Sequence, residues 1–326
     1  MTYAVDPELV PWLTMLPQSS FSEYEQAREA QAALLRHRPP YEPVTPLDVR
    51  DAQVPGPEGA PEVAVRILAP SGRGADERLP GLVFVHGGGF VFGSVDGLEY
   101  DAARIADQVG AVVVCVEYRL APEHPFPAGL EDCYAALTWT AAHADDLGID
   151  PGRLGIGGES AGGGLTAALA ILARDRGGPA LCLQYLGIPE LDDRLDTPSM
   201  RAYVDTPMWD RHRAEQSWDF YLGGPGLRGG PSVSPYAAPA RAEDLSGLPP
   251  AYVTVCQFDP LRDEGVAYTQ RLMHAGVLTE LHQYPGTFHG AAGLPGPAVS
   301  ERMVAGMLAA LRRGLRAGKE RSTHEV

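Results

Sequence analysis

A serine flanked by glycines is the clearest sign of chemistry in this sequence. Gly158-Glu159-Ser160-Ala161-Gly162 follows a short apolar run at 153–156 and precedes an alanine-rich stretch at 165–173. This arrangement predicts a sharp strand-to-helix turn that holds the serine in a strained backbone conformation. The glycines remove Cβ atoms that would collide, and the hydroxyl lies at a helix N-terminus, which favours negative charge. Ser160 is therefore a candidate nucleophile, although a serine in an ordinary glycine-rich loop would have the same sequence pattern.

A second glycine-rich segment could hold the negative charge that a nucleophilic serine generates. His86-Gly87-Gly88-Gly89-Phe90 comes directly after the apolar run 82–85. Consecutive glycines let backbone N–H groups approach a reacting oxygen, and each donor typically contributes about 2.7–4 kcal/mol to the transition state. Taken alone, the segment could be only a flexible loop. Its place after an early strand and upstream of Ser160 favours an oxyanion hole.

Ser160 needs a base, and the base needs an acid to orient it. Of the nine histidines, His289 lies in the loop that follows the last predicted strand. Asp259 directly follows another apolar run and lies between Ser160 and His289 in the chain, the order nucleophile, acid, base. An aspartate before proline also commonly starts a helix, and Asp263 is the nearby rival, but Asp263 should lie one turn into the helix and point away. We expect Asp259 to hold the His289 imidazole in the correct tautomer.

The elements around these residues predict a sheet that brings them to one edge. The expected strands are 63–68, 82–85, 112–116, 154–156, 181–185, 252–256 and 279–284, and the expected helices are 97–109, 129–144, 161–176, 262–275 and 298–316. Such alternation predicts an α/β fold with a doubly wound, mostly parallel sheet. The active site of such a sheet lies beyond the carboxyl ends of its strands, where the three candidate residues fall.

Two segments do not follow the alternation. Residues 1–50 contain an amphipathic stretch, and residues 190–235 carry several aromatic side chains between two strands. An insertion of that length is uncommon in a compact domain unless it forms a lid or a binding element. We expect 51–189 and 236–326 to form the catalytic domain and 1–50 and 190–235 to form a small, mainly helical cap. The aromatic residues of the cap would line a pocket or only pack the cap onto the core.

Composition limits the class of partner and the location. The net charge of −16 opposes binding to nucleic acid or anionic membranes and favours a neutral or cationic small-molecule substrate. The four cysteines are far apart and form no C-x-x-C pair, which indicates buried thiols and no metal site. No signal peptide is visible at the N-terminus, and no apolar stretch is long enough to span a bilayer. We expect a cytoplasmic protein without a membrane span.

Together these residues give the chain a resemblance to a known family. It resembles the hormone-sensitive-lipase family of α/β-hydrolases, the bacterial family IV esterases, across roughly residues 60–316. The matching motifs are His86-Gly87-Gly88-Gly89, residues 118–128 (YRLAPEHPFPA), residues 158–163 and residues 259–263. The three prolines of residues 118–128 predict a stiff supporting loop in which cis peptide bonds are allowed. The resemblance implies an α/β-hydrolase fold with a cap.

The same resemblance implies roles for residues around the nucleophile. The N–H groups of Gly88, Gly89 and Ala161 would form the oxyanion hole. His86, Gly87, Gly158, Glu159 and Gly162 would support that site without acting in the chemistry. Glu159 departs from the family, which most often has aspartate there. Residues 290–292 lack the phenylalanine often found after the base, which leaves that pocket wall undetermined.

The residues and the resemblance together predict a serine carboxylesterase. It would hydrolyse short- to medium-chain acyl esters through an acyl-serine intermediate, with no metal or organic cofactor. An amidase or deacetylase would use the same three residues and remains an alternative. A ligand receptor on this fold is a further alternative, which the presence of Ser160, Asp259 and His289 disfavours. A homodimer is left open.

Overall fold

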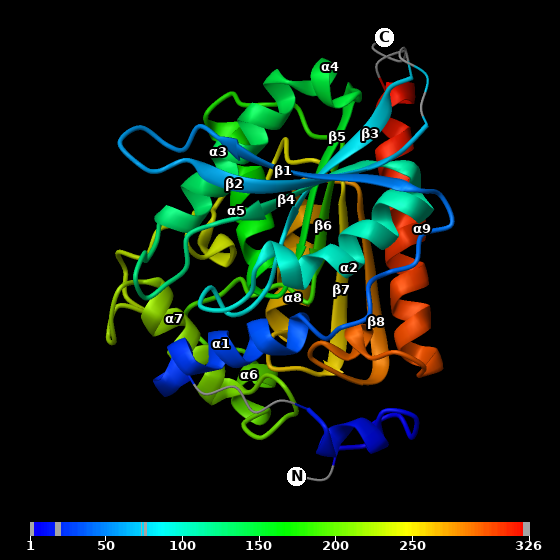
Figure 1. Ribbon diagram of the computed structural model, residues 1–326. Coiled ribbons are helices and arrows are strands. Elements are labelled where there is room, and N and C mark those ends of the chain that lie inside the picture. The colour runs from blue at the N-terminus through cyan, green and yellow to red at the C-terminus, as the bar shows by residue number, and fades with distance from the viewer. Residues whose placement is uncertain (1–2, 17–20, 73, 75–76, 322–326) are drawn as a thin grey trace.

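An eight-stranded sheet runs through the middle of the molecule (Figure 1). The computed structural model describes residues 3–16, 21–72, 74 and 77–321. The strand order across the sheet is β1-β2-β4-β3-β5-β6-β7-β8. The strands are β1 (Leu47–Val54), β2 (Val63–Pro70), β3 (Leu79–Val85), β4 (Val112–Glu117), β5 (Ile149–Glu159), β6 (Leu183–Gly187), β7 (Ala251–Phe258) and β8 (Thr279–Phe288).

The sheet is mostly parallel, as the sequence predicts. From β4 across to β8 every neighbouring pair is parallel, whereas β2 is antiparallel to both β1 and β4. The prediction did not include β1, which lies at the edge of the sheet and is largely exposed. Its sequence, LDVRDAQV, is more polar than the runs that identify the buried strands.

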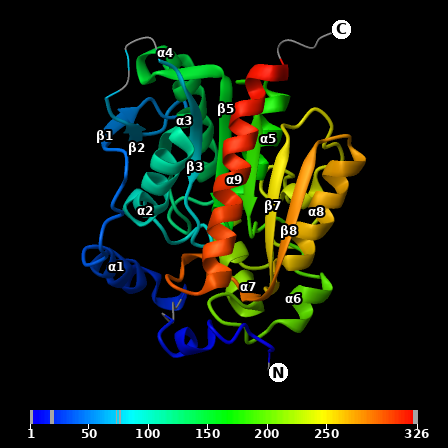
Figure 2. The ribbon, with the colours of Figure 1, turned by 90° about the vertical axis from the view of Figure 1, so that its right-hand side faces the viewer.

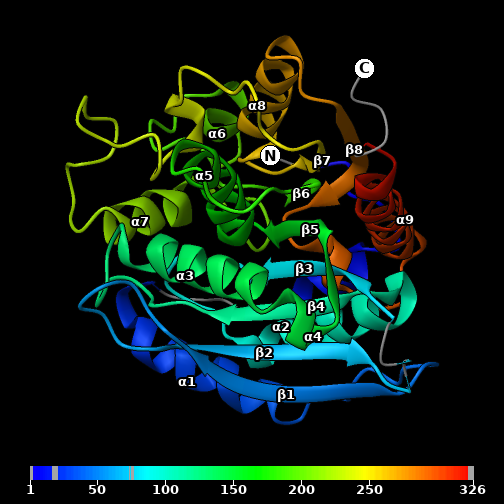
Figure 3. The ribbon, with the colours of Figure 1, turned by 90° about the horizontal axis from the view of Figure 1, so that it is seen from above.

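Helices cover both faces of the sheet (Figure 3), which confirms the doubly wound α/β fold. One face carries α3 (Ala128–Ala142), α5 (Ala161–Asp175) and α8 (Arg262–His274), and the other carries α2 (Val95–Ile105) and α9 (Ala298–Arg321). A π-helical turn, Ala106–Gly110, extends α2, and the short α4 (Ala144–Leu147) precedes β5. Each predicted helix corresponds to one of α2, α3, α5, α8 and α9.

The central strands contribute side chains to two separate cores. In β4, Val112 and Val114 pack toward α3 and α5, whereas Val113 and Cys115 pack toward α2 and α9. All four side chains are fully buried. Successive side chains of a strand point to opposite faces, so a strand covered on both faces is apolar throughout. This burial explains why the apolar runs identified the parallel strands.

Two stretches of chain, here called the covering segments, lie beyond the carboxyl ends of the strands (Figures 1 and 2). They are residues 3–35 without 17–20, and residues 190–235. Their helices are η1 (Val10–Thr14), η2 (Phe21–Glu23), α1 (Tyr24–Leu35), α6 (Pro198–Ala202) and α7 (Arg211–Tyr221). Thr197 and Asp210 cap α6 and α7 through side-chain hydrogen bonds to backbone N–H groups.

The two covering segments pack together through aromatic side chains. Phe21 is buried and stacks on Phe220 of α7, with ring centroids 6.1 Å apart. Residues 47–50, expected with the cap, instead pair with β2 as the start of β1. Of the predicted domains, residues 1–2, 17–20, 73, 75–76 and 322–326 lie outside the described residues.

The loop of residues 118–128 lies between β4 and α3. The peptide bonds Ala121–Pro122 and Phe126–Pro127 are cis. The loop also receives hydrogen bonds from the first covering segment, because Arg28 donates to the Ala121 carbonyl and pairs with Glu123 at 2.6 Å. No helix in the described part of the chain is long and apolar enough to cross a membrane.

Candidate active site

Ser160 lies at the sharp turn between β5 and α5. Its backbone has φ 57° and ψ −124°, a region that costs a residue with a side chain about 1–3 kcal/mol. A Cβ at Gly158 would lie 2.5 Å from the Gly162 carbonyl oxygen, and one at Gly162 would lie 2.3 Å from that of Val85. Both positions therefore need glycine, because the strand and helix backbones approach too closely for a side chain. The Ser160 N–H donates to the Gly187 carbonyl at 2.8 Å, which helps to hold the strained turn.

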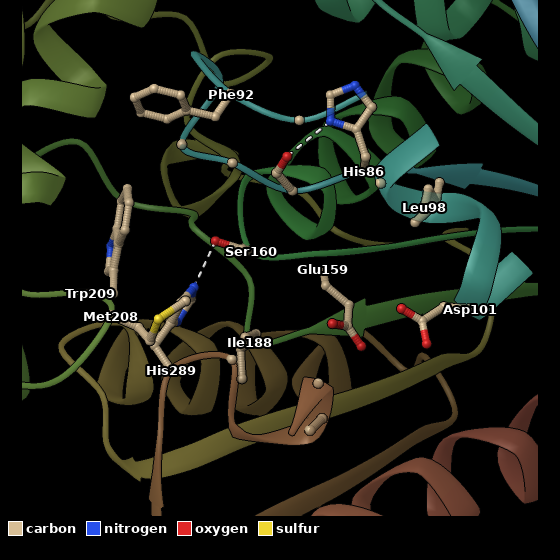
Figure 4. A pocket seen from close by; sticks show the side chains of 18 of the residues that line it. His86, Phe92, Leu98, Asp101, Glu159, Ser160, Ile188, Met208, Trp209 and His289 are labelled. Atoms are coloured by element: carbon tan, nitrogen blue, oxygen red, sulfur yellow. Dashed lines mark hydrogen bonds between the residues drawn. The ribbon is translucent and has the colours of Figure 1, made fainter. Parts of the chain in front are cut away.

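The three residues with predicted chemical roles form one hydrogen-bonded chain. Nε2 of His289 lies 2.8 Å from Oγ of Ser160, and Nδ1 of His289 lies 2.7 Å from Oδ2 of Asp259 (Figure 4 draws the first of these bonds). The other oxygen of Asp259 accepts the Leu261 N–H at 2.9 Å, which fixes the carboxylate. All three side chains are buried. This arrangement lets the imidazole take a proton from the serine while the carboxylate stabilises the imidazolium.

The rival carboxylate, Asp263, has different partners. It accepts the Ser199 N–H at 2.7 Å and pairs with Arg262 at 2.8 Å. Its carboxylate thus connects α8 to the start of α6 and does not contact His289. The choice of Asp259 over Asp263 agrees with this geometry.

The glycine-rich loop after β3 approaches the nucleophile along its backbone. A Cβ at Gly87 would lie 3.3 Å from Cβ of Ser160 and 2.7 Å from the Glu159 carbonyl oxygen. Gly88 and Gly89 have φ values of 122° and 56°. Neither of their N–H groups donates a hydrogen bond to another described residue. These N–H groups are available to an oxygen bound beside Ser160, together with the first N–H of α5 at Ala161.

His86 and Tyr118 support the glycine-rich loop from behind. Their rings are stacked with centroids 4.2 Å apart, and the Tyr118 hydroxyl donates to the His86 carbonyl at 3.0 Å. Nδ1 of His86 lies 2.9 Å from the Gly87 carbonyl oxygen. Burial lowers the pKa of His86 to about 4, so the ring is neutral at neutral pH. His86 therefore shapes the loop and is not placed to exchange protons with Ser160.

Ser160 and His289 open onto a pocket of about 460 Å³. One wall comes from the covering segments and includes Phe21, Met208 and Trp209. The wall after the base, which the sequence left undetermined, consists of Gly290, Ala292 and Gly293. Other lining residues come from α2 and α9, and include Leu98, Asp101, Met303 and Met307. Sequence reasoning missed the residues of α2 and α9, because nothing in their local pattern distinguishes a pocket-facing turn from a core-facing one.

Glu159, the unusual residue before the nucleophile, also lines this pocket. Its Oε1 accepts the Tyr185 hydroxyl at 2.6 Å. Burial raises its pKa, while the bond from Tyr185 opposes that shift. The carboxyl is therefore anchored to β6, and it remains on the surface of the pocket. Among the described residues, no three His, Cys, Asp or Glu side chains gather in a way that could hold a metal ion.

Comparison with known proteins agrees with this geometry. A family model described as alpha/beta hydrolase fold matches residues 82–293. The carboxylesterase NlhH of Mycobacterium tuberculosis is 39% identical over 318 residues, covering 95% of this chain and 98% of that protein. An arylesterase of Saccharolobus solfataricus is 32% identical over 95% of this chain and 99% of its own length.

Solved structures of esterases have the same fold. A structure described as bacterial heroin esterase superimposes with a TM-score of 0.91 at 47% identity, covering 96% of this chain and 98% of that one. An esterase from the archaeon Pyrobaculum calidifontis gives a TM-score of 0.82 at 34% identity, over 95% and 98% of the two chains. The chain therefore belongs to the alpha/beta hydrolase family, within its group of carboxylic ester hydrolases.

Proposed function

We propose that this chain hydrolyses carboxylic esters with short to medium acyl chains through an acyl-enzyme on Ser160. The single observation that carries the proposal is the chain of bonds from Asp259 through His289 to Ser160, at 2.7 and 2.8 Å. Its position at a strained turn beside free N–H groups supports acyl transfer over a structural role. The pocket volume of about 460 Å³ supports a small substrate.

In the proposed reaction, Oγ of Ser160 attacks the ester carbonyl as Nε2 of His289 removes the serine proton. The carbonyl oxygen becomes an oxyanion, held by the N–H groups of Gly88, Gly89 and Ala161. His289 then gives its proton to the leaving alcohol. Water attacks the acyl-serine with His289 again as base, which releases the acid and restores the serine. Asp259 orients the imidazole and stabilises the imidazolium throughout.

We also propose that the covering segments act as a cap on a catalytic domain of residues 47–189 and 236–326, which includes all of β1. Support comes from their place over the strand ends and from Phe21, Met208 and Trp209, which line the pocket. The cap would exclude water and limit the length of the acyl chain. A cytoplasmic location stays a prediction, and the choice between a monomer and a homodimer stays open.

A series of aryl esters from two to sixteen acyl carbons, with one matched anilide, tests the proposal. We expect turnover to peak at short or medium chains and the anilide to react far more slowly. Ser160→Ala should reduce kcat by about ten-thousand-fold or more without unfolding the protein, as removal of a serine nucleophile does elsewhere. Near-normal activity of that variant would refute the nucleophile.

Two other outcomes of the series contradict parts of the proposal. Equal rates at two and sixteen carbons would exclude an enclosed acyl pocket. An anilide that reacts as fast as the ester would favour the amidase or deacetylase alternative, which uses the same residues.

A further inference from the structure

Two carboxyl groups face each other inside the pocket, next to the nucleophile. Glu159 directly precedes Ser160 at the end of β5, and Asp101 comes from the last half of α2. Both line the pocket, and their side chains point toward one another (Figure 4). The negative charge of Asp101 acts on Glu159 and contributes to its raised pKa, after burial. The reaction proposed for Ser160 uses neither carboxyl.

The Asp101 carboxyl has no hydrogen-bond or ion-pair partner in the part of the chain that the structure describes. It makes no hydrogen bond or ion pair with a described residue, although it lies deep enough for burial to raise its pKa. Arg38 and Arg104 act on it only from a distance, since both guanidinium groups stack on the Tyr100 ring, 4.3 and 4.8 Å from its centroid. A buried carboxylate normally has an ion-pair or hydrogen-bond partner. This one faces open space in the pocket.

Only one of the two carboxylate oxygens of Glu159 has a hydrogen-bond partner among the described residues. Oε1 accepts the Tyr185 hydroxyl, whereas Oε2 has no hydrogen bond to a described residue. Arg213, which also lines the pocket, cannot neutralise the pair because it is held by Asp210, the N-cap of α7. His289 also acts on Glu159, but it is engaged by Asp259 and Ser160. Among the described residues that line it, the pocket therefore has two carboxyls and no cation placed between them.

The surroundings of the pair suit a cation with an apolar surface. Leu98 lies one turn before Asp101 on the same face of α2, and both line the pocket with Ile188. Alkyl groups on a nitrogen could pack against these side chains while the charge lies between the carboxylates. A strongly hydrated metal ion would find few oxygen ligands here. The net charge of −16 also attracts cations over longer distances.

We propose that the pocket selects carboxylic esters that carry a tertiary or quaternary ammonium group, which binds between Asp101 and Glu159 while the ester carbonyl lies at Ser160. This inference rests on the proposed ester hydrolysis and adds the substrate class. Glu159 and Ser160 line the same pocket, so one substrate can place its ammonium group and its ester there together. Asp101 acts as a specificity residue and takes no part in bond breaking.

An isosteric pair of esters isolates the charge. Trimethylammonioethyl butyrate and 3,3-dimethylbutyl butyrate have the same shape and differ by a nitrogen cation in place of a carbon. We expect the wild-type protein to have a higher kcat/KM for the ammonium ester. Asp101→Asn should lower the ratio of the two kcat/KM values by about tenfold, because one partner of a partly buried charge pair is lost.

Asp96→Asn is the matched control. Asp96 lies in the first turn of α2, is largely exposed and pairs with Arg66. Its substitution removes the same charge from the same helix but from outside the pocket, and should leave the ratio unchanged. A second pair of esters, with trimethylammonio or tert-butyl at the end of the acyl chain, tells whether the cation belongs to the alcohol or to the acid. A charge preference in either pair supports the proposal.

Three results would overturn the inference while the proposed function survives. In the first, the wild-type protein hydrolyses the carbon and ammonium esters equally well in both pairs. In the second, Asp101→Asn and Asp96→Asn change the ratio of the two kcat/KM values equally. In the third, Asp101→Asn has the same ratio as the wild type. Failure to hydrolyse any of these esters would instead reject the proposed function. If Asp101→Asn does not fold, inhibition of the wild-type protein tests the inference instead. Tetramethylammonium should compete with a neutral aryl ester far better than tert-butanol does, and equal inhibition would overturn the inference.

Discussion

The pocket has two sides that are built by different kinds of contact. On the sheet side, Ser160, Asp259 and His289 each follow a strand within a few residues, so the backbone of the sheet sets their positions. On the covering side, Phe21 and Trp209 come from segments almost 190 residues apart, and their aromatic rings meet with 5.9 Å between centroids. The chemistry thus depends on local backbone geometry, whereas the size and shape of the pocket depend on side-chain packing between distant segments.

The two sides meet at the glycine-rich loop. Trp209 stacks on the His289 ring at 5.6 Å, and a Cβ at Gly89 would lie 2.6 Å from Cη2 of Trp209. The Ser217 hydroxyl of α7 donates to the Gly89 carbonyl at 3.0 Å. The covering side therefore contacts both the predicted base and the predicted oxyanion hole. Substitutions on each side should separate effects on turnover from effects on selectivity.

Asp259→Asn should give the largest effect that does not remove the nucleophile. The amide would present the wrong hydrogen-bonding group to Nδ1 of His289 and favour the tautomer that cannot accept the serine proton. We expect kcat on a short aryl ester to fall by about ten-thousand-fold, with the fold retained. Steady-state kinetics and thermal unfolding measure the two effects.

Asp263→Asn is the control for this sheet-side prediction. Asp263 lies four residues further along, and among the described residues its carboxylate bonds only to Ser199 and Arg262. Its substitution should change kcat by less than about threefold, since surface ion pairs contribute little. Comparable losses in the two variants would contradict the role of Asp259.

The same two sides differ in how far the sequence alone predicted them. Ser160, Asp259 and His289 were predicted because each motif is local: a glycine on either side of a turn, or a polar residue just after an apolar run. The buried strands were predicted because burial on both faces makes them apolar throughout. The edge strand β1 was missed because one exposed face leaves Leu47–Val54 polar.

The contacts of the covering side could not be predicted from local patterns. Aromatic residues at 190–235 were expected to line a pocket or to pack onto the core, and both occur. Met208 and Trp209 line the pocket, whereas Trp218 and Tyr221 are buried in the core against Phe90. Which residue takes which role depends on how α7 is rotated against the loop after β3. Asp101 was missed for the same reason, because the orientation of α2 decides that it faces Glu159.

Gly89→Ala should give an intermediate effect, because it acts where the two sides meet. The new methyl group would collide with Trp209 and would strain a backbone whose φ is 56°. Either response, a shifted loop or a displaced ring, moves the N–H groups predicted to bind the oxyanion. We expect kcat to fall by about a hundredfold, near the loss for one oxyanion donor.

Gly177→Ala separates backbone strain from this collision. Gly177 follows α5 with φ 61°, and no atom lies within 4 Å of the Cβ it would gain. It should cost about 1–2 kcal/mol of stability through strain alone and leave kcat unchanged. If both variants lost stability equally and neither lost activity, contact between the covering side and the loop would have no part in catalysis.

Trp209→Phe should give the smallest effect, and one on selectivity more than on rate. The substitution removes the part of the indole that approaches Gly89 and leaves a ring to pack against Phe21. The vacated space would admit one or two further methylene groups, each worth about 0.8 kcal/mol when buried. The ratio of kcat/KM for a hexanoyl ester to that for an acetyl ester should therefore rise several-fold.

Trp139→Phe is the control, because Trp139 stacks on His143 at the end of α3 and does not line the pocket. An unchanged ratio in Trp209→Phe would mean that the covering side encloses the pocket without setting its size.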